Sequence, residues 1–245
     1  ENQQVDFVAS KIMFFDKVID SHPYNYKFAK TRVIDVTKEP DSPMFHLVTC
    51  MFRREAFTDR FFDTSLTISE DAKLLSEILK DKKAYGVVSR GQYNYRKRQD
   101  DSSAIGSQRR NRDFFLVTPE KAYRYMMDLW RDDNGKIEPF MQHQILRDLM
   151  WRLVMDRQYV LSSDEEQTYK EMIYSLIREI DTSIIVKMRA LNLRLKVFLL
   201  RVKYDGSFEE MVQLSEGRYL IDNEVLCKTG EGNSVFIDFI HSLGR

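Results

Sequence analysis

The sequence predicts an α/β protein with a mixed sheet first, a helical segment next and a small β-rich tail last. Three observations lead to this prediction. β-Branched and aromatic runs dominate the N-terminal part, apolar residues recur at helical spacing from Pro119 onward, and short strand-like runs follow Asp205. The predicted domains are residues 1–112, 113–192 and 193–245.

The predicted sheet consists of runs that are rich in β-branched and aromatic residues and bounded by turn-forming residues. These runs are residues 5–15 (VDFVASKIMFF), 31–36, 46–52 (HLVTCMF), 85–88 and 93–96. Gly91 predicts a break between the last two. Because the first strand pattern starts directly after Glu1, we expect the sequence to be a truncated fragment of a longer protein.

A helix is predicted to begin behind Ser69, which can cap it, with Glu70 and Asp71 in its first turn. Its apolar face comprises Leu74, Leu75, Ile78 and Leu79. Further helices are predicted from Pro119, from about residue 138 to 155, and from the capping residue Ser162 through Ile184. For residues 193–204 both helix and strand remain open, while 219–221 and 235–239 predict strands with Gly230 and Gly232 between them.

Composition excludes several classes of protein. Lys+Arg and Asp+Glu are equal at 38 each, so no net charge attracts nucleic acid. Two distant cysteines, Cys50 and Cys227, suit a reducing compartment better than a disulfide scaffold. No apolar run reaches the roughly 18–20 residues of a spanning helix. We therefore expect a cytoplasmic protein, with contact to the inner face of the membrane as an open alternative.

The adjacent acids Glu70 and Asp71 have two interpretations of about equal weight. Acids in a first helical turn are common because they complement the helix dipole. Alternatively, one carboxylate faces a cleft as a general base, held rigidly by the helix. Since neighbouring helical residues point about 100° apart, only one of the two acids can be that base.

An aromatic and basic segment runs from Tyr93 to Arg98. It is either an exposed edge strand with solvated charges or a site where Arg96 and Arg98 bind phosphate oxygens through their guanidinium forks. Ser102 and Ser103 could add hydroxyl donors. Phosphate-loop patterns are absent from the sequence, and no two aspartates are separated by one residue, so the simplest divalent-metal motif is missing.

Four segments in this order resemble the second half of a family 2 glycosyltransferase with the GT-A fold. They are VDFVASKIMFF, HLVTCMFRREAF, FFDTSLTISEDAKLL and YNYRKRQDDSSAI. A later segment, FMQHQILRDLMWRLV, resembles the helical region behind the catalytic domain of bacterial capsule and teichoic-acid-type enzymes. The resemblance covers roughly residues 5–155. Members of the family begin with a nucleotide-binding half, and this sequence contains no segment that resembles it.

The resemblance implies inverting transfer of a sugar to a hydroxyl of a cell-surface polysaccharide or related acceptor. It assigns Asp71 as the base and Glu70 as its neighbour, and it brings Arg96, Arg98, Ser102 and Ser103 to the donor diphosphate. The residues implied for the acceptor cleft are His46, Thr49, Cys50 and Tyr93. Expected partners are a nucleotide sugar, most simply a UDP-sugar, and a saccharide or lipid-linked acceptor, without nucleic acid.

Mg2+ or Mn2+ is implied for the intact enzyme, with its ligands outside this sequence. A fragment without the donor half is expected to be inactive alone. The alternative function is a non-catalytic interaction or oligomerisation module of a polysaccharide-assembly enzyme, formed mainly by the part from residue 113 onward. Peripheral membrane contact and homo-oligomer formation remain open.

Overall fold

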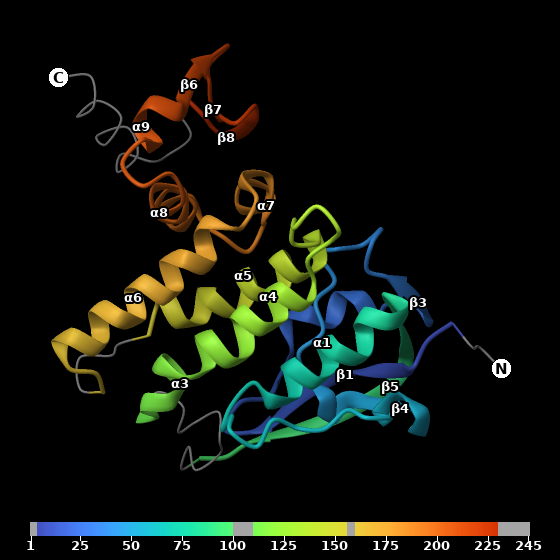
Figure 1. Cartoon of the computed structure of the whole chain (residues 1–245). Coiled ribbons are helices and arrows are strands. Elements are labelled where there is room, and N and C mark those ends of the chain that lie inside the picture. Colours follow the sequence, from blue (N-terminus) through green and yellow to red (C-terminus); the bar gives the residue numbers. More distant parts are fainter. Residues whose placement is uncertain (1–3, 100–109, 156–159, 230–245) are drawn as a thin grey trace. The chain divides into compact units, whose positions relative to one another are not determined.

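The structure is a computed structural model that describes residues 4–99, 110–155 and 160–229. It consists of two compact units, divided between Met172 and Ile173. The predicted α/β class is confirmed, since a mixed sheet and helices form the first unit and a small antiparallel sheet lies in the second (Figure 1). Among the described residues, no helix is both long and apolar enough to cross a membrane. The predicted domain boundaries remain predictions.

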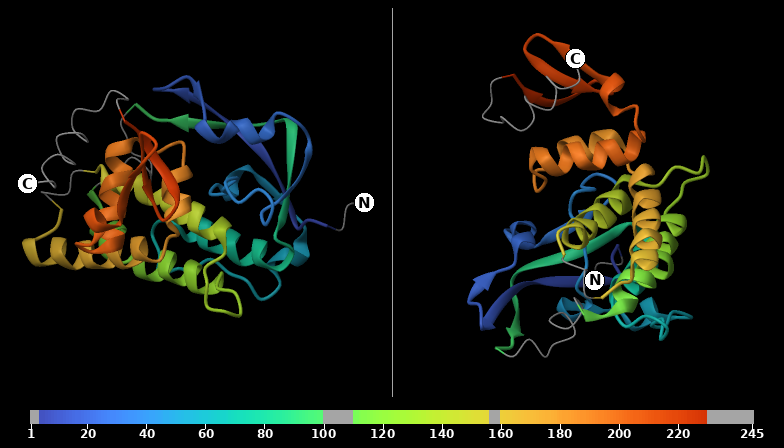
Figure 2. Two further views of the ribbon diagram at one scale, coloured as in Figure 1. Left: turned by 90° about the horizontal axis from the view of Figure 1, so that it is seen from above. Right: turned by 90° about the vertical axis from the view of Figure 1, so that its left-hand side faces the viewer.

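Two long parallel strands form the centre of the first sheet. They are β1 (Phe7–Asp16) and β5 (Ala84–Lys97), which lie side by side in Figures 1 and 2. The short strand β3 (Arg32–Asp35) pairs antiparallel with β5, whereas β2 (Asp20–Ser21) and β4 (Cys50–Phe52) pair antiparallel with β1. The strands predicted near residues 5–15 and 31–36 are thus confirmed.

The break predicted at Gly91 is wrong, because β5 continues through it as one strand. The register shifts there instead: Val88 faces Ser10, and Gln92 faces the next residue, Lys11. The extra residues form a β-bulge. A Cβ atom on Gly91 would lie 2.8 Å from Cγ2 of Val88 and 3.1 Å from Cβ of Ser10, so the bulge requires glycine at this position.

A second glycine lets β1 and β5 approach each other. A Cβ atom on Gly86 would lie 2.6 Å from Cγ1 of Val8. We therefore expect Gly86→Ala to lower the free energy of unfolding by about 1–3 kcal/mol, the usual cost of overpacking. Arg90→Ala, at an exposed position of the same strand, is the control and should change it by less than about 0.5 kcal/mol. Urea denaturation measures both, and equal midpoints for the two variants would contradict the prediction.

The strand predicted over residues 46–52 is only half correct. Leu47–Thr49 forms the 3-10 turn η2, and only β4 is extended. The turn forms because both the amide N–H and the hydroxyl of Thr49 donate to the carbonyl oxygen of His46, at 3.2 and 2.8 Å. A second unpredicted 3-10 helix, η1 (Pro23–Phe28), follows β2.

Helix α1 (Glu70–Lys82) is confirmed, and its predicted apolar face is buried. The capping role predicted for Ser69 is wrong, because its side chain makes no capping hydrogen bond. Ser69 has a left-handed backbone (φ 72°) rather than the extended one that aims an N-cap hydroxyl at the first amides. A non-glycine residue in this conformation costs about 1 kcal/mol or more, and such residues cluster at functional sites.

The helical segment begins earlier than the Pro119 start that the sequence predicts. Helix α3 (Arg112–Leu116) is capped by Asn111, whose Oδ1 accepts from the amide of Asp113. A π-helical stretch, η5 (Pro119–Arg124), leads into α4 (Tyr125–Leu129). The fully buried indole of Trp130 donates to the carbonyl oxygen of Ser76 at 3.2 Å, which ties this segment to α1. Helix α5 (Pro139–Leu153) follows as predicted.

Helix α6 (Ser163–Arg178) spans the boundary between the two units. The predicted cap is confirmed, since Ser162 Oγ accepts from the Glu165 amide while the Glu165 carboxylate accepts from the Ser162 amide. The helix ends before Ile184, which belongs to α7 (Thr182–Lys187). The apolar periodicity of the sequence thus continues from α6 into α7 and does not show where the first helix ends.

In the second unit the ambiguous residues 193–204 form helix α8 (Leu193–Tyr204), capped by Asn192. A short helix, α9 (Phe208–Met211), precedes the antiparallel sheet of β6 (Val212–Ser215), β7 (Arg218–Ile221) and β8 (Glu224–Lys228) (Figure 2). The predicted strand 219–221 is therefore confirmed. The predictions for Gly230, Gly232 and residues 235–239 lie outside the described residues.

Candidate active site

The carboxylate of Asp71 lies at the N-terminus of α1 in a largely desolvated position. Burial and the neighbouring charge of Glu70 raise its pKa to about 6. The charge of Asp148 on α5 also raises this pKa, while hydrogen bonds from the amides of Ala72 and Leu47 partly offset the increase. A carboxyl group with a pKa near 6 can accept a proton at neutral pH and still hold it well, as a general base requires.

Tyr95 on β5 is the aromatic side chain that the structure brings towards this carboxylate. Its pKa is raised by burial and by the charges of Tyr93 and Asp71. Tyr93 and Tyr95 share one face of β5, because side chains alternate along a strand. The alternation of tyrosines in the sequence signalled this face, whereas the contribution of Asp148 could not be predicted from a residue so distant in the chain.

One wall of the site is the segment from His46 to Cys50. Thr49 is buried, and its hydroxyl is already bonded to the His46 carbonyl oxygen. The carbonyl oxygen of Thr49 accepts from Ser10 Oγ at 3.3 Å. Cys50 Sγ also donates to the His46 carbonyl oxygen, at 3.5 Å, and the charge of Asp71 acts on this thiol. Thr49 and Cys50 therefore shape the wall.

The thiol of Cys50 is expected to be unreactive in the folded protein. Burial raises its pKa to about 12, so at pH 8 only about one thiol in 10,000 would be ionised, and the thiolate is the reactive form. Alkylation by iodoacetamide at pH 8, followed by mass spectrometry, should leave Cys50 unmodified until urea unfolds the chain. Rapid modification of the folded protein would show that this wall opens in solution.

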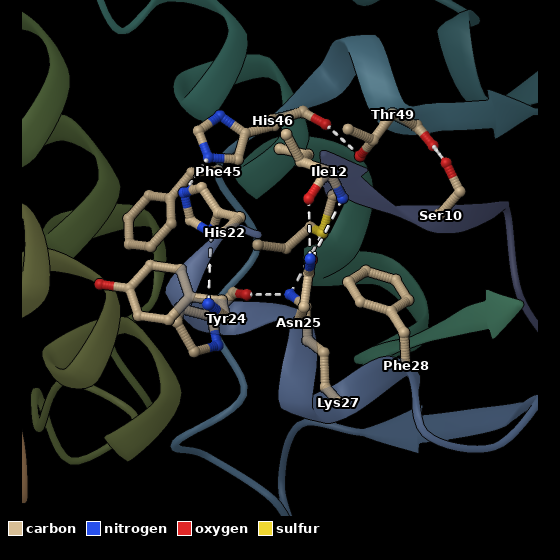
Figure 3. A pocket seen from close by; sticks show the side chains of 12 residues that line it. Ser10, Ile12, His22, Tyr24, Asn25, Lys27, Phe28, Phe45, His46 and Thr49 are labelled. Atoms are coloured by element: carbon tan, nitrogen blue, oxygen red, sulfur yellow. Dashed lines mark hydrogen bonds between the residues drawn. The ribbon is translucent and has the colours of Figure 1, made fainter. Parts of the chain in front are cut away.

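His46 contacts a second histidine, His22, which precedes η1 (Figure 3). Their Nε2 atoms lie 3.2 Å apart, and the rings are nearly perpendicular. Burial lowers the pKa of His46 to about 3 and that of His22 to about 4, and the charge of Lys27 contributes to both shifts. Both imidazoles are therefore neutral at physiological pH.

Beside this pair lies a small cavity of about 20 Å³, which has room for roughly one water molecule. Lys27 lies at its base, fully buried, with Nζ bonded to Tyr85 Oη at 3.3 Å and to the carbonyl oxygen of Pro43 (Figure 3 shows Lys27 among the lining residues). Desolvation lowers the pKa of Lys27 to about 7. The cavity is too small for a sugar, so any acceptor would bind outside it.

The predicted diphosphate residues are only partly described. Arg96 is exposed and donates from Nε to Asp16 Oδ2 at 2.8 Å. Arg98 is exposed and follows β5, whereas Ser102 and Ser103 lie outside the described residues. Because side chains alternate along β5, Arg96 projects from the face opposite Tyr95. The contact of the predicted residues Arg96, Arg98, Ser102 and Ser103 with a diphosphate remains a prediction.

The described residues do not fit a divalent metal ion. Within the ranges 4–99, 110–155 and 160–229, no three His, Cys, Asp or Glu side chains gather as metal ligands would. No chemical step is therefore assigned to a metal here, and the prediction of Mg2+ or Mn2+ in the intact enzyme remains a prediction.

Comparison with known proteins gives two sequence relatives. The chain is 28% identical over 211 residues to the minor teichoic acid biosynthesis protein GgaB of Bacillus subtilis (strain 168), covering 85% of this chain and 23% of GgaB. It is 23% identical over 213 residues to GgaA of the same strain, covering 73% of this chain and 47% of GgaA. The chain is therefore similar in sequence to two teichoic acid biosynthesis proteins. It spans less than half the length of each.

A solved structure supports the fold. TarS residues 1–349 of S. aureus, in complex with UDP-GlcNAc, match 93% of this chain with a TM-score of 0.51 and 14% sequence identity, over 66% of the TarS chain. No protein-family model matches the chain. Together, the relatives and this structure confirm the predicted resemblance to teichoic-acid-type glycosyltransferases with a GT-A-like fold.

Proposed function

We propose that the chain carries the acceptor-side part of an inverting glycosyltransferase that acts in cell-wall polysaccharide assembly. The observation that carries this proposal is Asp71, a desolvated carboxyl group at a helix N-terminus whose pKa is raised to about 6. The relatives support the class of reaction, since both are named for teichoic acid biosynthesis. TarS binds UDP-GlcNAc, which favours a UDP-sugar as the donor.

In the proposed reaction an acceptor hydroxyl transfers its proton to the Asp71 carboxylate while its oxygen attacks the anomeric carbon. A new glycosidic C–O bond forms, and the bond between the anomeric carbon and the diphosphate oxygen breaks. The electron pair of that bond leaves with UDP. Because a single displacement occurs from the opposite face of the sugar, the anomeric configuration inverts.

The other residues of the site have supporting roles in this proposal. Glu70 keeps the pKa of Asp71 high, and Tyr95 presents an aromatic surface on which a sugar ring can pack. Arg96 and Arg98 would approach the diphosphate with Ser102 and Ser103. We also propose that the protein acts in the cytoplasm, as the sequence predicts.

The test uses the natural protein that contains this sequence, because the chain spans only 23% of GgaB and 47% of GgaA. Acceptor-dependent release of UDP from UDP-GlcNAc and other UDP-sugars should be observed and should disappear in Asp71→Asn. Unchanged release in that variant would contradict the role of Asp71. If no UDP-sugar supports transfer and the chain only associates in a concentration-dependent way, the alternative of an interaction module would be favoured.

A further inference from the structure

The contact between His22 and His46 determines which nitrogen of each ring carries the proton. The amide N–H of Tyr24 donates to Nδ1 of His22 at 3.2 Å, as part of the cap of η1. Nδ1 of His22 must therefore be unprotonated. Since this imidazole is neutral, its single proton lies on Nε2.

The proton of His46 follows from the same reasoning. Nε2 of His22 donates to Nε2 of His46 across 3.2 Å, so Nε2 of His46 is an acceptor. A neutral imidazole that accepts at Nε2 carries its proton on Nδ1. The Tyr24 amide thus sets the tautomer of His22, which sets that of His46. This pair is not suited to binding a metal ion through both Nε2 atoms, because His22 would need a proton on Nδ1.

The Nδ1–H group of His46 has no hydrogen-bond acceptor among the residues described in the structure, and it is not among the buried polar atoms there that lack a partner. It is therefore an accessible donor. His46 directly precedes Leu47, whose amide bonds to the Asp71 carboxylate, and its carbonyl oxygen holds the turn that forms the wall of the site. The donor of His46 is thus one residue away from an amide that contacts the Asp71 carboxylate.

We propose that His46 donates its Nδ1–H to an oxygen of the acceptor saccharide, next to the hydroxyl that Asp71 deprotonates, and that His22 is the positioning residue that fixes this tautomer. This inference rests on the proposed function. It explains why a histidine pair lies in the wall, since the side chain of a solvated neutral histidine favours the proton on Nε2 and a partner is needed to hold it on Nδ1. The lowered pKa of each ring agrees with neutral tautomers.

The first test is the NMR spectrum of the imidazole nitrogens in this chain, which has only four histidines. At pH 7, His22 should carry its proton on Nε2 and His46 on Nδ1. His22→Asn keeps an acceptor for the Tyr24 amide but removes the donor to His46, so His46 should shift towards the Nε2–H tautomer. His22→Gln is the matched variant, because its amide can still donate to His46. An Nε2–H tautomer of His46 in the wild type would show that His22 does not set the tautomer of His46.

The second test measures transfer by the natural protein that contains this sequence, with UDP-GlcNAc as the donor and purified Bacillus subtilis teichoic acid as the acceptor probe. His46→Gln keeps a group at the Nε2 position and removes the Nδ1 donor, so the KM for the acceptor should rise about 3–10-fold, the value of one neutral hydrogen bond. His46→Asn places an amide near the Nδ1 position, so its KM for the acceptor should rise less than that of His46→Gln. KM for the donor should not change in either variant.

The two tests separate the possible failures. Wild-type transfer with an unchanged acceptor KM in His46→Gln would overturn the contact between His46 and the acceptor and leave the proposed function intact. Absence of transfer by the wild type from UDP-GlcNAc and from the other UDP-sugars would contradict the proposed function and, with it, this contact. The NMR spectrum would still decide whether His22 sets the tautomer of His46.

Discussion

Asp71→Asn is expected to lower kcat for sugar transfer by about 10²–10⁴-fold, the usual contribution of a general base. Asparagine has nearly the same shape but cannot accept the proton of the acceptor hydroxyl. The wild-type rate should fall with decreasing pH around an apparent pKa of about 6, because Asp71 must be ionised to act. Glu70→Gln is the matched control and should cause a smaller loss, with the apparent pKa of the remaining activity lowered.

The same substitution should not destabilise the fold. The folded-state pKa of Asp71, about 6, lies above the unfolded value of about 3.9, so the ionised carboxylate costs stability above pH 6. This cost disappears as the pH falls from 6 to 4, where the carboxyl group is protonated in the folded state. Asp71→Asn removes an ionised group at pH 7 and should raise the free energy of unfolding by about 1–3 kcal/mol.

A combined measurement of transfer rate and thermal unfolding distinguishes a base from a structural residue. Lost activity with an equal or higher Tm supports the assignment of Asp71. Lost activity with a markedly lower Tm would mean that the carboxylate supports the fold. Full activity in Asp71→Asn would identify another residue as the base.

Arg152→Leu is expected to lower the free energy of unfolding by about 3 kcal/mol or more, since it removes a buried charge from a hydrogen-bonded network. The Arg152 side chain is fully buried on α5. It donates to Tyr123 Oη and to the carbonyl oxygen of Phe114, and its guanidinium carbon lies 3.5 Å from the ring centroid of Phe114. Tyr123 in turn donates to Asp148.

Loss of the guanidinium would leave the carbonyl oxygen of Phe114 without this donor in a buried position. For a chain of this size the expected loss corresponds to a decrease in Tm of about 10 °C, measurable by circular dichroism. Arg131→Leu is the control, because Arg131 forms a partly exposed pair with Asp128 at 3.0 Å that contributes less than about 1 kcal/mol. Equal effects of the two substitutions would contradict the structural role of Arg152.

The network around Arg152 also bears on the site, because Asp148 raises the pKa of Asp71. None of this was visible in the sequence. Arg152 and Tyr123 are ordinary polar positions in helical patterns, and their convergence depends on how α5 packs against η5. Sequence periodicity predicts which face of a helix is apolar, but it does not predict which buried polar groups meet.

The sequence by itself determined the local features of this protein. Apolar spacing predicted α1, α5 and the start of α6, and β-branched runs predicted β1, β3 and β7. The acid pair at the start of α1 was a candidate from its pattern, and the family resemblance implied that Asp71 is the base. These features depend on residues close in the chain. Prediction from the sequence was wrong where a single residue changes the backbone over a short distance. These places are the bulge at Gly91, the left-handed backbone of Ser69 and the turn closed by Thr49.

Only the tertiary structure decided the environment of Asp71. The carboxylate owes its raised pKa first to burial and then to Glu70, and Asp148 adds to the increase. The wall beside it includes a histidine whose partner, His22, is separated from it by η1 and β3. Desolvation and hydrogen bonding are set by atoms that become neighbours only when distant segments pack together. A sequence pattern can name the acid, but its protonation and its partners are properties of the folded protein.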